Sequence, residues 1–137
     1  MPRFMVQVRA SKDSESGTPP STDLMLKMLA YNQSLAEAGV IISGNGLLSS
    51  AAGARITFDA SGDASVASGP FDLETVVSGY WVFEAKDLEE AIGWARKAPM
   101  KAGATLEVRK VSGPEDFGEQ ATDEVKTAHA ELGKKMG

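Results

Sequence analysis

The sequence predicts one α+β domain of ferredoxin-like layout, with elements in the order β-α-β-β-α-β and a hairpin inserted after the second strand. Apolar residues alternate with polar ones at 3–9, and a strand-like segment apolar on both sides lies at 79–85. Apolar residues recur with a helical period at 24–38 and 88–95. The length of 137 residues suits one domain and leaves little room for two.

The first half of the chain predicts a strand, a loop and a helix. Residues 3–9 place their apolar side chains on one face of a strand. The polar segment 11–20 ends in two prolines and is typical of a loop. Ser21 or Thr22 can cap the following helix, and Gly39 stands where a left-handed C-terminal cap residue belongs. The helix stripe contains Leu24, Met28, Tyr31, Leu35 and Ala38.

The second half predicts the remaining strands and a second helix. A strand begins at 40–42, is interrupted by the glycine-containing segment 43–46 and resumes at Leu47-Leu48. Segments 54–58 and 64–67 form the inserted hairpin around a turn. After the strand at 79–85, Asp87 can cap a helix that Pro99 ends. The last strand is expected at 104–111.

A homodimer is expected because two helices cover only one face of the sheet. The chain offers no third core helix for the other face, so a second copy is the economical cover. Trp81 and Phe83 are assigned to that face and hence to the dimer interface. We assign residues 1–112 to the domain and 113–137 to a linker and a polar C-terminal helical tail.

The composition excludes several kinds of site. The chain has no cysteine, which removes disulfides, thiolate metal ligands and cysteine nucleophiles. Its net charge of −5 argues against a nucleic-acid surface. No apolar run approaches the about 20 residues that span a bilayer, so we expect a cytoplasmic protein without a membrane partner. The one histidine, His129, lies in the polar tail, so neither a metal site nor a cofactor is expected.

The residues that could carry chemistry each have an ordinary structural role as well. Asp72 and Glu74 can divide acid and base roles, but loop carboxylates usually have no catalytic part. The Gly44-Asn45-Gly46 segment fits a bulge better than a phosphate loop, since the third glycine of the dinucleotide fingerprint is absent. Aromatic residues at strand and helix spacing are usually core, yet some can line a ligand pocket. The expected pocket residues are Tyr31, Asn45, Phe71 and Tyr80.

Three sequence pieces in a fixed order resemble the YCII-related family, in its DGPF-type branch. They are Ser68-Gly69-Pro70-Phe71, Gly79-Tyr80-Trp81-Val82 and the helix segment 88–95. The resemblance covers roughly residues 1–120, and Ser68 stands where the branch has an aspartate. It implies ferredoxin-like dimers that join their sheets around a cleft. The wider group includes dehalogenating and lactone-processing enzymes with a proposed His-Asp pair, whose histidine has no match here.

Two kinds of function follow. The first is a small-molecule-binding dimer, or a cofactor-free enzyme, with its cleft near the Gly-Pro-Phe loop. In it Asp72 or Glu74 would act as acid or base, beside the pocket wall named above. The second is a non-catalytic regulatory or interaction module. The sequence contains no complete catalytic constellation that decides between them.

Overall fold

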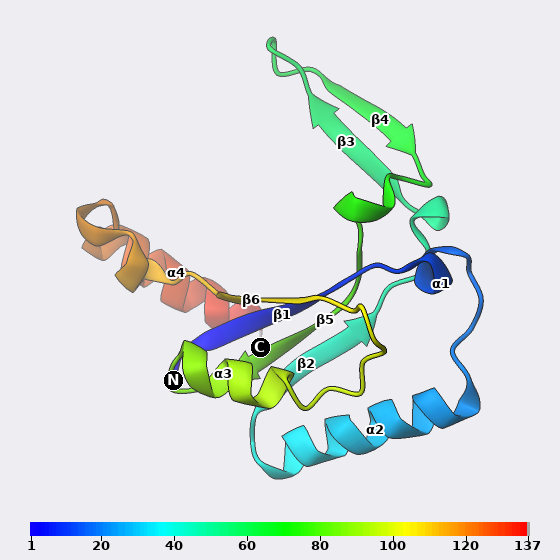
Figure 1. Ribbon diagram of the computed structural model, residues 1–137. Coiled ribbons are helices and arrows are strands. Elements are labelled where there is room, and N and C mark those ends of the chain that lie inside the picture. The colour runs from blue at the N-terminus through cyan, green and yellow to red at the C-terminus, as the bar shows by residue number, and fades with distance from the viewer. Residues whose placement is uncertain (137) are drawn as a thin grey trace.

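A computed structural model describes residues 1–136 of the chain (Figure 1). Its helices and strands have the following bounds: β1 Arg3–Arg9, α1 Lys12–Glu15, α2 Thr22–Glu37, β2 Ile41–Gly46, β3 Ala54–Phe58, β4 Ala64–Ser68, β5 Val77–Glu84, α3 Leu88–Ala95, β6 Leu106–Lys110 and α4 Asp123–Met136. The short α1 lies in the segment that the sequence assigns to a loop, where Ser11 caps it by accepting from the Ser14 amide. Single-turn helices of this length have too little periodicity to be recognised.

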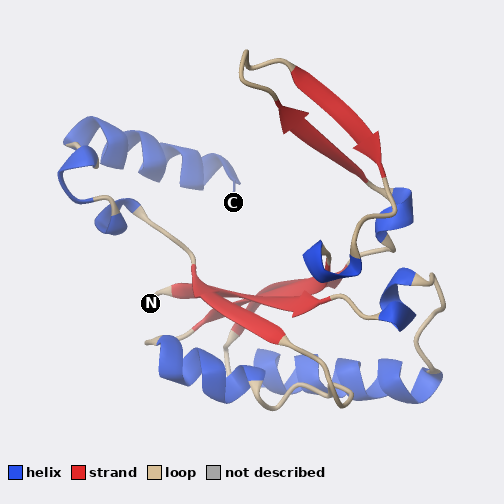
Figure 2. Cartoon of the chain, turned by 45° about the horizontal axis from the view of Figure 1, so that its top comes forward, coloured by secondary structure: helices blue, strands red, loops and turns tan. Residues whose placement is uncertain are grey.

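The main sheet has the strand order β2-β5-β1-β6, and all its pairs are antiparallel. With the hairpin set aside, this is the ferredoxin-like order, as the sequence predicts. Helices α2 and α3 lie on one face of the sheet, and both figures show the opposite face without a covering helix (Figures 1 and 2). The expected fold class is therefore confirmed.

Local sequence explains the borders of the helices. Ser21 accepts a hydrogen bond from the Leu24 amide and begins α2, while Gly39 follows the helix with a φ of +72°. Asp87 accepts from the Glu90 amide at 2.9 Å and begins α3.

No helix among residues 1–136 is both long and apolar enough to cross a membrane.

The core lies between the sheet and its two helices. Trp81 and Phe83 are 5% and 0% exposed and pack in a cluster with Val6, Tyr31 and Leu35. Strand pairing fixes their direction, because Val6 stands opposite Trp81 and cross-strand neighbours share a face. The expectation that Trp81 and Phe83 form a dimer interface is therefore wrong: they face α2 within the same chain.

The open face of the sheet carries the alternate residues of the same strands. Met5 and Val82 are paired there, and Gln7 stands opposite Tyr80. These side chains are half-buried, and the surface that they form mixes apolar and polar groups. We call this surface, made by Met5, Gln7, Tyr80 and Val82, the open face.

Two segments stand apart from this body. Strands β3 and β4 form a separate two-stranded sheet, and α4 follows β6 through short 3-10 turns. Both lie on the side of the main sheet away from α2 and α3 (Figure 2). Every residue of the two hairpin strands is exposed, and α4 has no buried residue.

Candidate functional site

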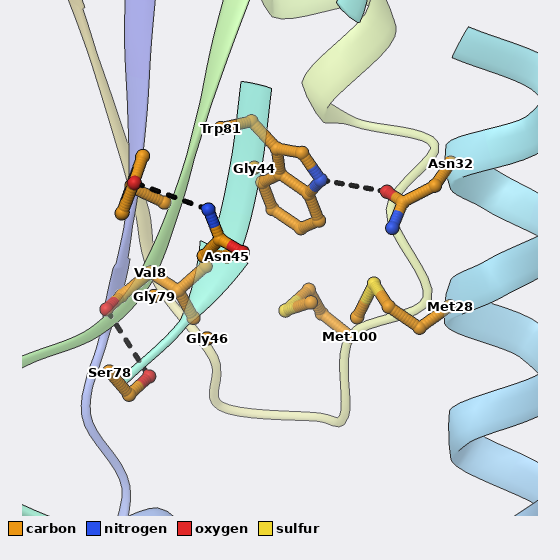
Figure 3. A pocket seen from close by; sticks show the side chains of 11 residues that line it. Val8, Met28, Asn32, Gly44, Asn45, Gly46, Ser78, Gly79, Trp81 and Met100 are labelled. Atoms are coloured by element: carbon orange, nitrogen blue, oxygen red, sulfur yellow. Dashed lines mark hydrogen bonds between the residues drawn. The ribbon is translucent and has the colours of Figure 1, made fainter. Parts of the chain in front are cut away.

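A cavity of about 370 Å³ lies between α2 and the β2 and β5 strands of the sheet. Its lining comes from five parts of the chain: Val8 of β1, Met28 and Asn32 of α2, Gly44, Asn45 and Gly46 of β2, Ser78, Gly79, Tyr80 and Trp81 of β5, and Met100 after α3. Figure 3 shows these residues around the indole of Trp81. The volume falls at the lower end of the about 300–1,000 Å³ typical of ligand sites.

Glycines create the space under α2. Gly44 stands opposite Trp81 in the strand pairing, and Gly46 stands opposite Gly79. Because Trp81 faces α2, these glycines occupy inward-facing positions without a side chain. A Cβ atom at Gly44 would lie 2.6 Å from Trp81 Cδ1, whereas one at Gly46 would meet nothing within 4 Å. Gly44 thus lets the indole ring lie against β2, and Gly46 leaves the adjoining space empty.

One hydrogen bond orders the polar part of the cavity wall. Trp81 Nε1 donates to Asn32 Oδ1 at 2.8 Å (Figure 3). An indole N–H can only donate, so the bond fixes which way the Asn32 amide faces. The Asn32 Nδ2 group makes no hydrogen bond within residues 1–136 and points towards the side where Met28 and Met100 lie. It is a free donor on a part of the cavity wall that is otherwise formed by Met28, Met100 and the Trp81 ring.

The edge of the tryptophan ring is held from the helix side as well. The Tyr31 ring meets the Trp81 ring edge-on with centroids 5.4 Å apart. Tyr31 Oη donates to the Trp94 carbonyl at 2.8 Å, and burial raises the pKa of the phenol to about 12. Tyr31 therefore supports the Trp81 wall from behind, and it does not itself line the cavity.

Two other expected pocket residues belong to the lining but aim their side chains elsewhere. Asn45 stands opposite Tyr80, and strand alternation turns both side chains towards the open face. There Asn45 Nδ2 lies 3.4 Å from Tyr80 Oη, close to the limit of a hydrogen bond.

Three lining residues were not predicted from the sequence: Met28, Asn32 and Met100. A helix stripe and a loop methionine give no signal of a cavity.

The Gly-Pro-Phe loop lies at the base of the hairpin and not at the cavity. The Phe71 amide donates to Ser50 Oγ at 3.0 Å, and the Arg55 guanidinium lies 4.1 Å from the Phe71 ring centroid. Asp72 and Glu74 follow Phe71, are exposed, and are absent from the cavity lining. The structure gives these carboxylates neither the buried environment nor the neighbouring pocket that an acid-base pair needs.

The carboxylate of Glu15 anchors the foot of the β3–β4 hairpin. Glu15 accepts hydrogen bonds from both the amide and the hydroxyl of Ser50, with the amide at 2.8 Å. The two bonds from Ser50 lower the pKa of Glu15 below its usual value. Ser50 in turn accepts from Phe71, so Glu15 is linked through one serine to the returning end of the hairpin. The motif loop thus has a structural role that its sequence alone does not reveal.

Comparison with known proteins agrees with this architecture. The family description "YCII-related domain" matches residues 3–114. The chain belongs to the YCII-related domain family. The matched residues include every strand and both core helices, and α4 lies beyond them.

No curated protein sequence matches this chain. A solved structure similar to this YCII-related chain is the 5-chloro-2-hydroxyhydroquinone dehydrochlorinase of Burkholderia phenoliruptrix AC1100, in complex with 2,5-dihydroxybenzoquinone. The two share 17% identity with a TM-score of 0.44, over 82% of this chain and 97% of that one. What that enzyme binds is a property of that enzyme.

Proposed function

We propose that this YCII-related protein binds a small neutral molecule in the cavity between α2 and strands β2 and β5. The free Asn32 Nδ2 donor in a wall of Met28, Met100 and Trp81 is the observation that carries the proposal. No Asp, Glu, Lys, Arg or His belongs to the lining. A charged ligand would lose its hydration there without gaining an ionic partner, which disfavours it.

The lining also defines the shape and chemistry of the ligand. Thioether and indole groups favour a flat or aromatic body, since sulfur and aromatic faces contact such rings well. The Asn32 donor favours one carbonyl or ether oxygen on that body. A cavity of about 370 Å³ holds a ligand of one or two rings. Binding rather than acid-base catalysis is the favoured activity, because Asp72 and Glu74 lie outside the lining.

A titration followed by NMR tests the proposal. Acetophenone serves as the probe, with one ring and one carbonyl oxygen, and benzoate serves as its charged counterpart. We expect acetophenone to shift the Trp81 indole N–H and the Asn32 side-chain signals in a saturable way, and benzoate to leave them unchanged. Absence of saturable shifts with acetophenone and with related neutral aryl ketones would contradict the proposal.

A cavity-filling variant shows whether binding occurs at this place. Gly46→Leu puts a side chain where a Cβ meets nothing within 4 Å, so it fills the cavity without a backbone clash. Gly93→Leu is the matched control, because Gly93 is equally unobstructed but lies on α3 outside the lining. We expect G46L to abolish the shifts and G93L to retain them. Retained binding in G46L would move the site away from this cavity.

A further inference from the structure

A second groove lies between α3 and the edge strand β6. Its volume is about 320 Å³, and it shares no lining residue with the cavity under α2. Helix α3 packs on β6 and β1, whereas α2 packs on β2, so the two sites lie under different helices (Figure 1). The lining of the groove consists of Leu88, Ile92, Ala95 and Arg96 from α3 and its C-terminal end, and of Leu106 and Val108 from β6.

The position of β6 at the edge of the sheet explains why this space is open. The strand order ends at β6, so no further strand of residues 1–136 lies beyond it. Leu106 and Val108 stand opposite Val8 and Val6, and Val6 belongs to the core. Cross-strand neighbours share a face, so both β6 side chains turn to the helix side of the sheet. They form the floor of a groove that the sheet itself leaves open on one side.

Helix α3 leaves its two largest aliphatic residues only partly covered. Ala91 and Ala95 are 0% and 5% exposed, whereas Leu88 and Ile92 are 47% and 39% exposed. Leu88, Ile92 and Arg96 follow one another at intervals of four residues, so they lie along one side of the helix. Over eight residues that side extends about 12 Å. The groove is therefore a strip of branched aliphatic side chains that ends at a guanidinium group.

Arg96 is the one charged residue of this lining, and it has no ionic partner. None of the ion pairs among residues 1–136 includes it. Two other cations of the same region are already engaged. Lys110 Nζ lies 2.8 Å from Asp116 Oδ1, and Lys97 Nζ lies 4.5 Å from the centroid of the Trp94 six-atom wall. The guanidinium of Arg96 is thus available for an anion at the end of the aliphatic strip.

We propose that this groove binds a straight-chain alkyl carboxylate, with the chain along Leu88 and Ile92 and the carboxylate on Arg96. A guanidinium presents parallel N–H donors that match the two oxygens of a carboxylate. Aliphatic walls favour an alkyl chain, because each buried methylene group adds to the free energy of binding. A strip of about 12 Å fits a chain of about eight to ten carbon atoms. The ligand differs in charge and shape from the neutral ring proposed for the cavity under α2, so the two proposals are independent.

Three small molecules separate the contribution of the chain from that of the charge. Octanoate is the probe, and the methyl signals of Ile92, Leu106 and Val108 report on the groove by NMR. We expect octanoate to shift them in a saturable way and to leave the Trp81 indole N–H unchanged, since Trp81 lines the other cavity. Butyrate keeps the carboxylate but lacks four methylene groups, so it should bind at least about 30-fold more weakly. 1-Octanol keeps the chain without the charge and should bind at least about 10-fold more weakly.

Matched substitutions of two neighbouring cations test the role of Arg96. Arg96→Gln removes the charge at the groove, and Lys97→Gln removes the same charge at the next residue, which is outside the lining. Both residues are exposed, so both variants should fold. We expect R96Q to raise the dissociation constant of octanoate at least about 10-fold and K97Q to leave it unchanged. Arg96→Lys should give an intermediate value, because lysine keeps the charge without the paired N–H donors.

A competing carboxylate inside the chain provides an independent check. Ile92→Glu places an acidic side chain four residues before Arg96, where the two can pair on the helix surface. We expect I92E to abolish octanoate binding, and Ile92→Leu, which retains an aliphatic wall, to preserve it. Three results overturn the proposal: no saturable shift of the groove methyl signals with octanoate, equal affinity of R96Q and the wild type, or 1-octanol binding as tightly as octanoate. None of them bears on the cavity under α2, whose neutral probe is followed at Trp81.

Discussion

Trp81 Nε1 and Asn32 Oδ1 lie 2.8 Å apart and join the sheet to α2 across the wall of the cavity. Trp81 is 5% exposed, so its N–H depends on Asn32 as its protein acceptor. This bond therefore contributes both to the stability of the fold and to the geometry of the candidate site. It orders the Trp81 ring and frees the Asn32 amide nitrogen for a ligand.

Asn32→Leu should therefore destabilise the protein by about 1–3 kcal/mol, because the indole N–H stays buried without an acceptor. Urea denaturation measures the change. Asn32→Asp retains an oxygen acceptor for Trp81 but removes the amide donor, so it should unfold at a higher urea concentration than N32L and still fail to bind acetophenone. Equal unfolding midpoints for N32L and the wild type would show that the bond contributes nothing.

Two glycines of β2 should respond differently to the same substitution. Gly44→Ala puts a methyl group 2.6 Å from Trp81 Cδ1, and the ring can move away only by disturbing its bond to Asn32 and its contact with Tyr31. Overpacking of this kind costs about 1–3 kcal/mol. Gly46→Ala meets nothing within 4 Å and should change the free energy of unfolding by less than about 0.5 kcal/mol. Chemical denaturation of both variants checks the contrast, and similar values for the two would contradict it.

The strand order and the two core helices could be predicted because each segment shows its own period in the sequence. The side to which Trp81 and Phe83 turn could not be predicted from β5 alone, since both sides of that strand are apolar. It depends on the pairing of Val6 with Trp81, which places them beside the apolar stripe of α2. A strand that shifts by one residue exchanges its two faces, so a local pattern leaves this choice undecided.

The cavity was harder to foresee than the fold. It arises because glycines of β2 and β5, distant in the chain, occupy neighbouring inward positions. The Gly44-Asn45-Gly46 segment predicted an irregular strand. Only the pairing register with β5 shows that its two glycines line the cavity. For Phe71, the sequence predicted a place in the pocket. In the structure, Phe71 follows the hairpin and contacts Ser50 and Arg55 instead.

The attachment of the hairpin should depend on Gly69. A Cβ atom there would lie 1.8 Å from the Ser50 carbonyl oxygen, a backbone atom that cannot rotate away. Gly69→Ala should separate the loop from Ser50 and speed the exchange of the hairpin amide protons. Gly53→Ala is the control at the other end of the hairpin, where the same carbonyl lies at 3.5 Å, an ordinary contact. Hydrogen exchange followed by NMR should show the effect in G69A only.

The Glu15–Ser50 contact should give a measurable pH dependence. Hydrogen bonds from Ser50 lower the pKa of Glu15 below 4.5 in the folded protein. The resulting stabilisation is present above the unfolded pKa and is lost as the pH falls through the folded one. A carbon-detected NMR titration of the Glu15 carboxylate should have its midpoint below 4.5. Ser50→Ala should move that midpoint upwards, and Ser49→Ala should move it less. An unchanged midpoint in S50A would remove Ser50 as the cause.

At alkaline pH, the titration of Tyr31 should change the free energy of unfolding. Burial raises the pKa of its phenol from 10.0 to about 12, so the folded state holds the proton more tightly than the unfolded chain. The stabilisation is complete below pH 10 and is lost as the pH rises towards 12. Tyr31→Phe loses the bond to the Trp94 carbonyl, at a cost of about 0.5–1.5 kcal/mol near neutral pH. Because phenylalanine does not titrate, Y31F should also lose less stability than the wild type between pH 10 and 12. Urea midpoints of both proteins across this interval test the difference, and parallel curves would show that Tyr31 does not titrate as its burial requires.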